Sequence, residues 1–197
     1  MNLLLPPGSF GAYLFDCDGT IADSMPLHLD AWNAALEPAG AHFQEDLFYA
    51  WAGRSTQQIV ELLNQQFGLR MDYREISELK EQHYFSLLPQ IQPIPEVVEH
   101  IHEAYPRIPL AVVSGSPRAS VITTLKNFRL DGLFQCIVGA EDYTHGKPAP
   151  DPFLVAARAL GVPAHRCLVF EDADLGIQSA EAAGMQWVKV VPPRAGG

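Results

Sequence analysis

Residues 12–20 read AYLFDCDGT, an apolar run that passes directly into two aspartates, a glycine and a threonine. A short apolar run that ends in acidic residues predicts a buried strand with polar side chains at its carboxyl end. In an open α/β sheet, ligands bind at the carboxyl ends of the strands. We therefore expect Asp16 and Asp18 to lie at a binding site. The alternative for this segment is an aspartate-glycine turn without a function.

Four further apolar runs repeat this pattern, mostly with a helical pattern between them. They are Leu110–Val113, Cys136–Val138, Cys167–Phe170 and Trp187–Val190. The alternation predicts an α/β fold with a Rossmann-like parallel sheet as its core.

Prolines mark three helix starts in this part of the chain, because proline is favoured in the first turn of a helix. One helix is expected to begin near Pro95. The other two begin at Ser116-Pro117 and Asp151-Pro152, where Ser116 and Asp151 are the expected N-cap residues.

Residues 24–91 contain helical patterns and no convincing strand. One pattern starts at Pro26, a second at Ser55 with an S-x-x-Q capping box, and a third at Asp72 with D-x-x-E. We expect an all-helical domain of residues 24–91, inserted into an α/β core made of residues 1–23 and 92–197.

Composition limits the class of partner. The 197 residues are 48% hydrophobic and 18% charged, and 13 basic against 23 acidic residues give a net charge of −10. Such a surface repels nucleic acid and anionic lipid. Three cysteines without a C-x-x-C pair suggest neither a disulfide framework nor a zinc site. With no signal-peptide pattern at the start and no apolar stretch long enough to span a membrane, a cytoplasmic protein is expected.

Two of the predicted strands lead into loops suited to an anion. Ser114-Gly115-Ser116 follows the second strand, and hydroxyls with free N–H groups at a helix start can hold a phosphate. Lys147 lies after the third strand, in a loop stiffened by Pro148 and Pro150. This loop lacks the glycine and the Ser or Thr of a nucleotide-binding P-loop. In the alternative interpretations, the two serines and the glycine merely form a helix N-cap and a turn, and Lys147 is a solvated surface charge.

The fourth strand ends in Glu171 and Asp172. Adjacent carboxylates that leave a buried strand repel each other unless a cation lies between them. Acids also occur in the first turn of helices, where the helix dipole favours them, and that explains Asp174 better than it explains the other two.

Together these side chains suit phosphoryl transfer. Asp16 would attack phosphorus, and Asp18 would act as general acid and then as general base. Mg²⁺ would be held by Asp16, the main-chain carbonyl of Asp18 and Asp172, with Glu171 orienting from nearby. Stabilisation of the transferred oxygens would come from Lys147, Ser114 and Gly115.

Four segments in order, FDCDGT, VVSGS, GKPAPD and VFEDADLGIQSAEAAGM, resemble the four motifs of the haloacid dehalogenase-like phosphotransferases. The resemblance spans residues 12–185 and implies that the helical insertion is that family's cap. The last motif and ADSMPLHLDAW are similar to the sugar-phosphate branch, which includes fructose-1-phosphate and 6-phosphogluconate phosphatases and β-phosphoglucomutase.

Two cap residues follow from this resemblance. His28 matches a histidine that helps to position the acid/base aspartate, although it could be an ordinary polar residue of a helix. Arg54 lies in a loop similar to the family's cap loop, where it would contact an anionic or polyhydroxyl group. In the alternative, Gly53 merely ends one helix and Ser55 caps the next.

The leading hypothesis is a Mg²⁺-dependent phosphatase that acts, as a monomer, on small sugar phosphates such as fructose 1-phosphate or 6-phosphogluconate. A β-phosphoglucomutase is the nearest alternative, and Thr20 after the D-x-D-G segment favours the phosphatase. A receiver-type signalling protein also phosphorylates an aspartate, but its acceptor lies mid-chain on the third strand. A non-catalytic binding relative is the remaining possibility.

Overall fold

The computed structural model describes residues 3–191. The strands are β1 (Ala12–Phe15), β2 (Ala22–Asp23), β3 (Gln92–Pro93), β4 (Leu110–Val113), β5 (Cys136–Val138), β6 (Cys167–Glu171) and β7 (Gln186–Lys189). The α-helices are α1 (Met25–Leu36), α2 (Glu45–Ala50), α3 (Thr56–Phe67), α4 (Tyr73–Leu87), α5 (Pro95–Ala104), α6 (Arg118–Asn127), α7 (Asp151–Leu160) and α8 (Asp174–Ala182).

Five strands form one parallel sheet in the order β5-β4-β1-β6-β7, which confirms the predicted α/β class. The quoted segment that ends in Asp16 supplies β1, the central strand, and its neighbours on either side are β4 and β6. The polar residues that follow these three strands therefore meet at one edge of the sheet.

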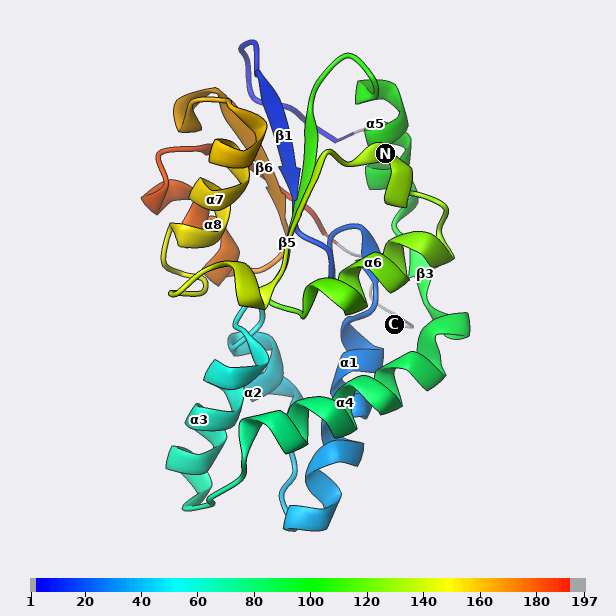
Figure 1. The fold of residues 1–197 in the computed structure, drawn as a ribbon, viewed down its shortest axis with the longest axis vertical. Helices are drawn as coiled ribbons and strands as arrows, with labels where there is room; N and C mark the ends of the chain where they lie inside the picture. The colour runs from blue at the N-terminus through cyan, green and yellow to red at the C-terminus, as the bar shows by residue number, and fades with distance from the viewer. Residues whose placement is uncertain (1–2, 192–197) are drawn as a thin grey trace.

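Helices cover both faces of this sheet. Because side chains alternate along a strand, Tyr13 and Phe15 point to one face and Ala12 and Leu14 to the other. The first face packs against α5 and α6, and the second packs against α7 and α8. Figure 1 shows these two helix pairs on opposite sides of the strands.

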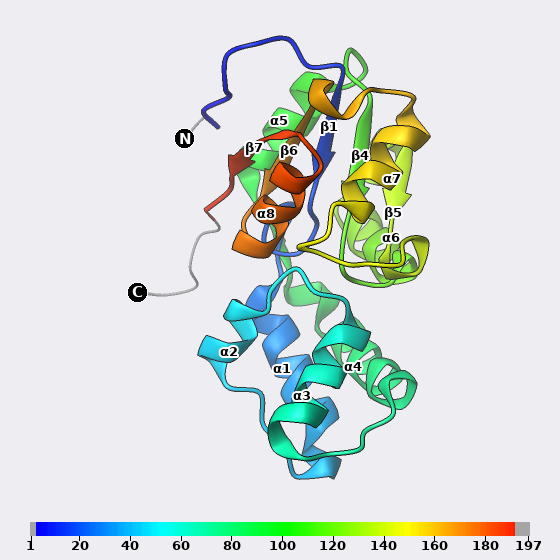
Figure 2. The same cartoon turned by 90° about the vertical axis from the view of Figure 1, so that its left-hand side faces the viewer.

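Helices α1 to α4 lie together beyond the edge of the sheet, as both Figure 1 and Figure 2 show. They have a separate apolar cluster, which includes Trp32, Phe43 and Leu63. The predicted capping box at the start of α3 is present, because Ser55 and Gln58 bond to each other's backbone N–H groups. Asp72 caps α4 as expected, by accepting from the N–H groups of Arg74 and Glu75.

The structure differs from the sequence predictions in a few places. Helix α2 was not expected, nor was the antiparallel pair β2–β3 that joins the two ends of the helical insertion. The prediction that Ser116 and Asp151 are N-caps was wrong. Helix α6 begins after Pro117 and α7 after Pro150, and the Ser116 hydroxyl bonds to Asp18 instead of to a helix N–H. Among residues 3–191, no helix is both long and apolar enough to cross a membrane.

Candidate active site

Asp16 follows β1 directly and is joined to the lysine of the stiff loop. The Lys147 ammonium group donates to Asp16 Oδ1 at 2.6 Å and to Glu171 Oε1 at 2.5 Å. It also donates to the Val113 carbonyl at 3.3 Å, and only 1% of Lys147 is exposed. The sheet thus brings together a lysine and an aspartate that lie 131 positions apart in the chain.

The charges of this cluster depend on one another. Burial raises the pKa of Asp16, Lys147 lowers it, and the nearby carboxylates Glu171 and Asp172 raise it again, with a net rise. Burial lowers the pKa of Lys147, but Asp16 and Glu171 outweigh burial and hold it above its usual value. The lysine is therefore a permanent cation, and further positive charge nearby would favour the ionised form of Asp16.

The acidic pair after β6 completes a cluster that suits a hard cation. Carboxylate oxygens of Asp16, Glu171 and Asp172 all lie within 4.8 Å of one another. Burial, and then the charge of Glu171, raise the pKa of Asp172 to about 7. This crowding of oxygen ligands fits Mg²⁺, which prefers such ligands and would relieve the repulsion.

The three carboxylates of the cluster are not equivalent. Glu171 Oε1 accepts from Lys147, and Glu171 Oε2 accepts from the Ala173 N–H at 2.8 Å. Asp172 Oδ1 accepts a hydrogen bond of 3.0 Å from the Thr20 hydroxyl and lines the pocket in front of Asp16. Since both Glu171 oxygens already have partners, this residue is better placed to orient Lys147 than to bind a cation directly.

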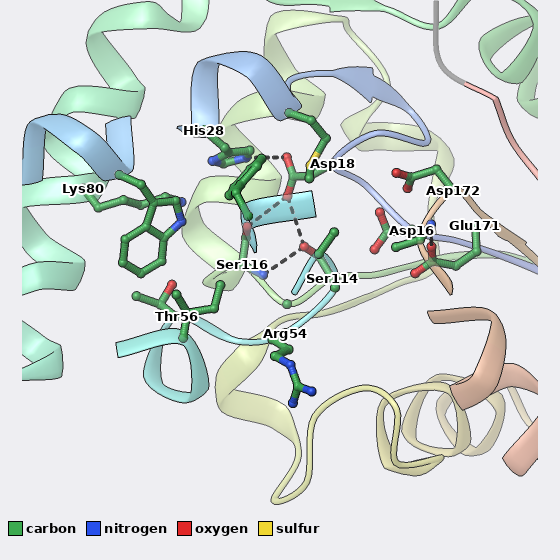
Figure 3. A pocket seen from close by; sticks show the side chains of 18 residues that line it. Asp16, Asp18, His28, Arg54, Thr56, Lys80, Ser114, Ser116, Glu171 and Asp172 are labelled. Atoms are coloured by element: carbon green, nitrogen blue, oxygen red, sulfur yellow. Dashed lines mark hydrogen bonds and ion pairs between the residues drawn. The ribbon is translucent and has the colours of Figure 1, made fainter. Parts of the chain in front are cut away.

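Asp18 lies in a different environment from Asp16, among hydroxyls and an imidazole. Its Oδ1 accepts from the Ser24 hydroxyl at 2.8 Å and lies 2.8 Å from His28 Nε2. Its Oδ2 accepts from the hydroxyls of Ser116 at 2.9 Å and Ser114 at 3.4 Å. Figure 3 shows Asp18 with His28, Ser114 and Ser116 on one side of the pocket, and Asp16, Glu171 and Asp172 on the other.

This environment favours the ionised form of Asp18. Burial raises the pKa of Asp18, but the charge and hydrogen bond of His28, the charge of Lys80 and the hydrogen bond from Ser24 outweigh burial. The net effect holds the pKa of Asp18 below its usual value. The two aspartates of the first motif thus have pKa values shifted in opposite directions, so in the metal-free protein Asp16 binds a proton more readily than Asp18 does.

The predicted anion loop lies beside both aspartates. The Ser116 N–H donates to the Ser114 hydroxyl at 3.0 Å, and both hydroxyls point to Asp18. Gly115 lies against the loop of the helical insertion, where a Cβ atom would come within 3.0 Å of the Gly53 carbonyl oxygen. Ser114, Gly115 and Ser116 all line the pocket in front of Asp16.

The two residues named from the cap resemblance also reach this pocket. His28 is 5% exposed, lies on α1 and contacts Asp18. Arg54 lines the pocket, but its guanidinium group points away from Asp18 in Figure 3. The buried Arg54 Nε has no hydrogen-bond partner among residues 3–191.

The sequence interpretation assigned no contact in the site to three polar residues. Ser24 and Thr20 hold Asp18 and Asp172, and Lys80 on α4 lines the pocket although it is only 2% exposed. Lys80 Nζ lies 2.8 Å from Glu81 Oε1. A lysine in the middle of a polar helix gives no sign of burial, so only the packing of α4 could identify Lys80.

The chain is also similar to proteins that are named as phosphatases. It is 36% identical over 182 residues to fructose-1-phosphate phosphatase YqaB of Escherichia coli, covering 92% of this chain and 96% of that protein. It is 27% identical over 179 residues to the phosphorylated carbohydrates phosphatase of Thermotoga maritima, covering 89% of this chain and 82% of that protein.

A solved structure and a family model are also similar to this chain. The β-phosphoglucomutase of Clostridium difficile matches with a TM-score of 0.82 at 24% identity, over 90% of this chain and 83% of that chain, which shows a shared fold. The family model of the haloacid dehalogenase-like hydrolases matches residues 13–190, so it includes all four motifs. This chain therefore belongs to the haloacid dehalogenase-like hydrolases.

Proposed function

We propose that the protein is a Mg²⁺-dependent phosphatase that hydrolyses small sugar phosphates through an aspartyl-phosphate on Asp16. One observation carries this proposal: the Asp16 carboxylate is bonded to a buried, charged Lys147 and faces a pocket beside Asp18. The relatives in Escherichia coli and Thermotoga maritima, which are named for phosphatase activity on phosphorylated sugars, support the substrate class.

In the first half of the reaction, an Asp16 oxygen attacks phosphorus and the bond from phosphorus to the ester oxygen breaks. The ester oxygen leaves with a proton from Asp18. Asp18 must be protonated for this step, and the negative charge of a bound phosphate next to it favours protonation. Lys147 stabilises the charge on the transferred oxygens.

In the second half, water attacks phosphorus, Asp18 accepts the proton of that water, and the bond between phosphorus and Asp16 breaks. The neighbours that lower the pKa of Asp18 keep it ionised once its proton has left with the ester oxygen, so it is ready to accept a proton from the attacking water. Mg²⁺ would be held by Asp16, Asp172 and the main-chain carbonyl of Asp18, with Glu171 behind them, and would neutralise phosphate charge.

We propose further that residues 24–91 act as the cap over this site. Helical-insertion residues supply one wall of the pocket, including His28, Arg54, Trp32 and Phe48. Arg54 would bind the part of the substrate away from the reacting phosphate. A pocket enclosed from two sides favours a small metabolite over a polymer, and a monomeric, cytoplasmic enzyme stays a prediction.

A β-phosphoglucomutase is the second candidate, because the same fold occurs in that enzyme. The mutase would return the phosphoryl group to a sugar instead of giving it to water. The deciding assay offers fructose 1-phosphate and β-glucose 1-phosphate with Mg²⁺. We expect inorganic phosphate from the first and no glucose 6-phosphate from the second, whereas glucose 6-phosphate would favour the mutase.

The nucleophile has its own test. Asp16→Asn keeps the size of the side chain but removes its charge, so Mg²⁺-dependent phosphate release should fall to background. Unchanged release would contradict the assignment of Asp16. If the wild-type protein instead formed a stable phosphoprotein and released no phosphate, that result would favour the signalling alternative.

A further inference from the structure

Two neighbouring hydrogen bonds connect α4 of the helical insertion to α6 of the sheet domain. The Tyr84 hydroxyl lies 3.0 Å from the Thr124 hydroxyl, and the Ser120 hydroxyl donates to Glu81. Residues three or four positions apart share a helix face, so each helix presents its two partners side by side. Tyr84 and Thr124 are each only 1% exposed. Figure 1 shows α4 and α6 facing each other across the gap between the two parts of the chain.

The ring of Tyr84 also contacts the site. It stacks face to face on the His28 imidazole, with ring centroids 4.1 Å apart and an angle of 6° between the planes. His28 Nε2 in turn lies 2.8 Å from Asp18 Oδ1. Tyr84 thus has a core helix at its hydroxyl end and the partner of Asp18 on its ring face.

We infer that Tyr84 is a positioning residue, which fixes the His28 ring against Asp18 only while α4 lies on α6. The inference rests on the proposed function, in which Asp18 protonates the leaving oxygen. A stack holds the plane of the imidazole, and the bond to Thr124 holds the tyrosine ring in register with the core. Residues that touch neither substrate nor Asp18 would thereby set the geometry of proton transfer.

The leaving group of the substrate can reveal this role. A sugar alkoxide is a strong base and leaves only with a proton, whereas p-nitrophenolate is a weak base and leaves without one. A variant that misplaces Asp18 should therefore lose more kcat/KM on fructose 1-phosphate than on p-nitrophenyl phosphate. A variant that only loosens the fold should lose kcat/KM equally on both.

The experiment compares both substrates with wild type, Tyr84→Leu, Tyr84→Phe and Thr124→Val. Tyr84→Leu removes the stack, and we expect the ratio of kcat/KM values, sugar phosphate over nitrophenyl phosphate, to fall about tenfold to hundredfold. Tyr84→Phe keeps the stack and loses the bond to Thr124, so its ratio should lie between those of wild type and Tyr84→Leu. Thr124→Val should match Tyr84→Phe, because it removes the same bond from the other side.

Two controls lie on the same helix. Tyr73→Phe removes an exposed hydroxyl from the start of α4, and Phe85→Leu shortens a ring that is 39% exposed next to Tyr84. Neither should change the ratio. Equal losses on both substrates in Tyr84→Leu, with an active wild type, would overturn this inference alone. A wild type that released phosphate from neither substrate would overturn the proposed function and this inference with it.

Discussion

Replacing Gly176 by alanine should destabilise the protein, although the same change in the interior of a helix normally stabilises it by about 1 kcal/mol. Gly176 lies in the first turn of α8, directly against the buried Glu171 carboxylate. A Cβ at position 176 would lie 2.7 Å from Glu171 Oε2 and closer still to Oε1, where ordinary contacts begin at 3.4 Å. Because Oε1 is the closer oxygen, the carboxylate would have to move by clearly more than the 0.7 Å that separates 2.7 Å from 3.4 Å.

That displacement acts on a side chain with no free space. Glu171 is fully buried and holds Lys147 at 2.5 Å and the Ala173 N–H at 2.8 Å. Overpacking costs about 1–3 kcal/mol, and a lost hydrogen bond to a charged group costs about 1.5–3 kcal/mol. After the gain from helix propensity, the net loss of unfolding free energy is about 1.5–5 kcal/mol. Because Lys147 would lose its support beside Asp16, kcat should fall about tenfold to hundredfold.

Urea unfolding and phosphate release measure these two effects. Gly132→Ala is the matched control, because a Cβ there would meet no atom within 4 Å, and its stability should stay the same or rise slightly. A Gly176→Ala protein as stable and as active as wild type would refute the reasoning that Glu171 leaves no room for a Cβ.

Three further predictions concern the charges and a helix cap. Because the folded pKa of Asp172 is raised to about 7, protonation of this group stabilises the metal-free protein below about pH 4, and that contribution is lost as the pH rises through about 7. Mg²⁺ must displace the same proton, so the affinity for Mg²⁺, measured by calorimetry, should be lower at pH 6 than at pH 8. Asp172→Asn should weaken Mg²⁺ binding at both pH values, and a pH-independent affinity in wild type would contradict the prediction. Lys147→Met leaves two buried carboxylates without their cation, so urea unfolding without Mg²⁺ should show a loss of about 3–5 kcal/mol in unfolding free energy. Mg²⁺ should restore part of this stability, and an unchanged urea midpoint would argue against the buried ion pair. Ser55→Ala removes the α3 capping box and should cost about 1 kcal/mol in thermal unfolding, whereas Gln57→Ala, at the exposed neighbouring position, should cost less; equal losses would contradict the cap.

The strands and their polar ends could be read from the sequence because both depend on local patterns. A buried parallel strand needs an apolar run, and the residue that leaves it must be polar if a ligand binds there. That reasoning found Asp16, Ser114 and Glu171, which follow or end β1, β4 and β6. The capping box at Ser55 was equally readable, because its partners are three residues apart.

Local pattern was a poorer guide where two interpretations compete for one residue. Ser116 precedes a proline and a helix, which is typical of an N-cap, but its hydroxyl bonds to Asp18 instead. The short strands β2 and β3 could not be predicted from the sequence, since two residues make no periodic pattern. Helix α2, with only six residues, was missed for the same reason.

The sequence by itself determined the class of fold, the order of the motifs and the residue types that phosphoryl transfer requires. Only the tertiary structure decided how those residues act on one another. Lys147 stays a cation despite its burial, and Asp16 and Asp18 have pKa values shifted in opposite directions, because burial and neighbouring charges set a pKa. Tyr84 matters for a similar reason: its partners His28 and Thr124 are 56 residues before it and 40 after it. The first contact exists only once α1 and α4 have packed together, and the second only once α4 has packed on α6.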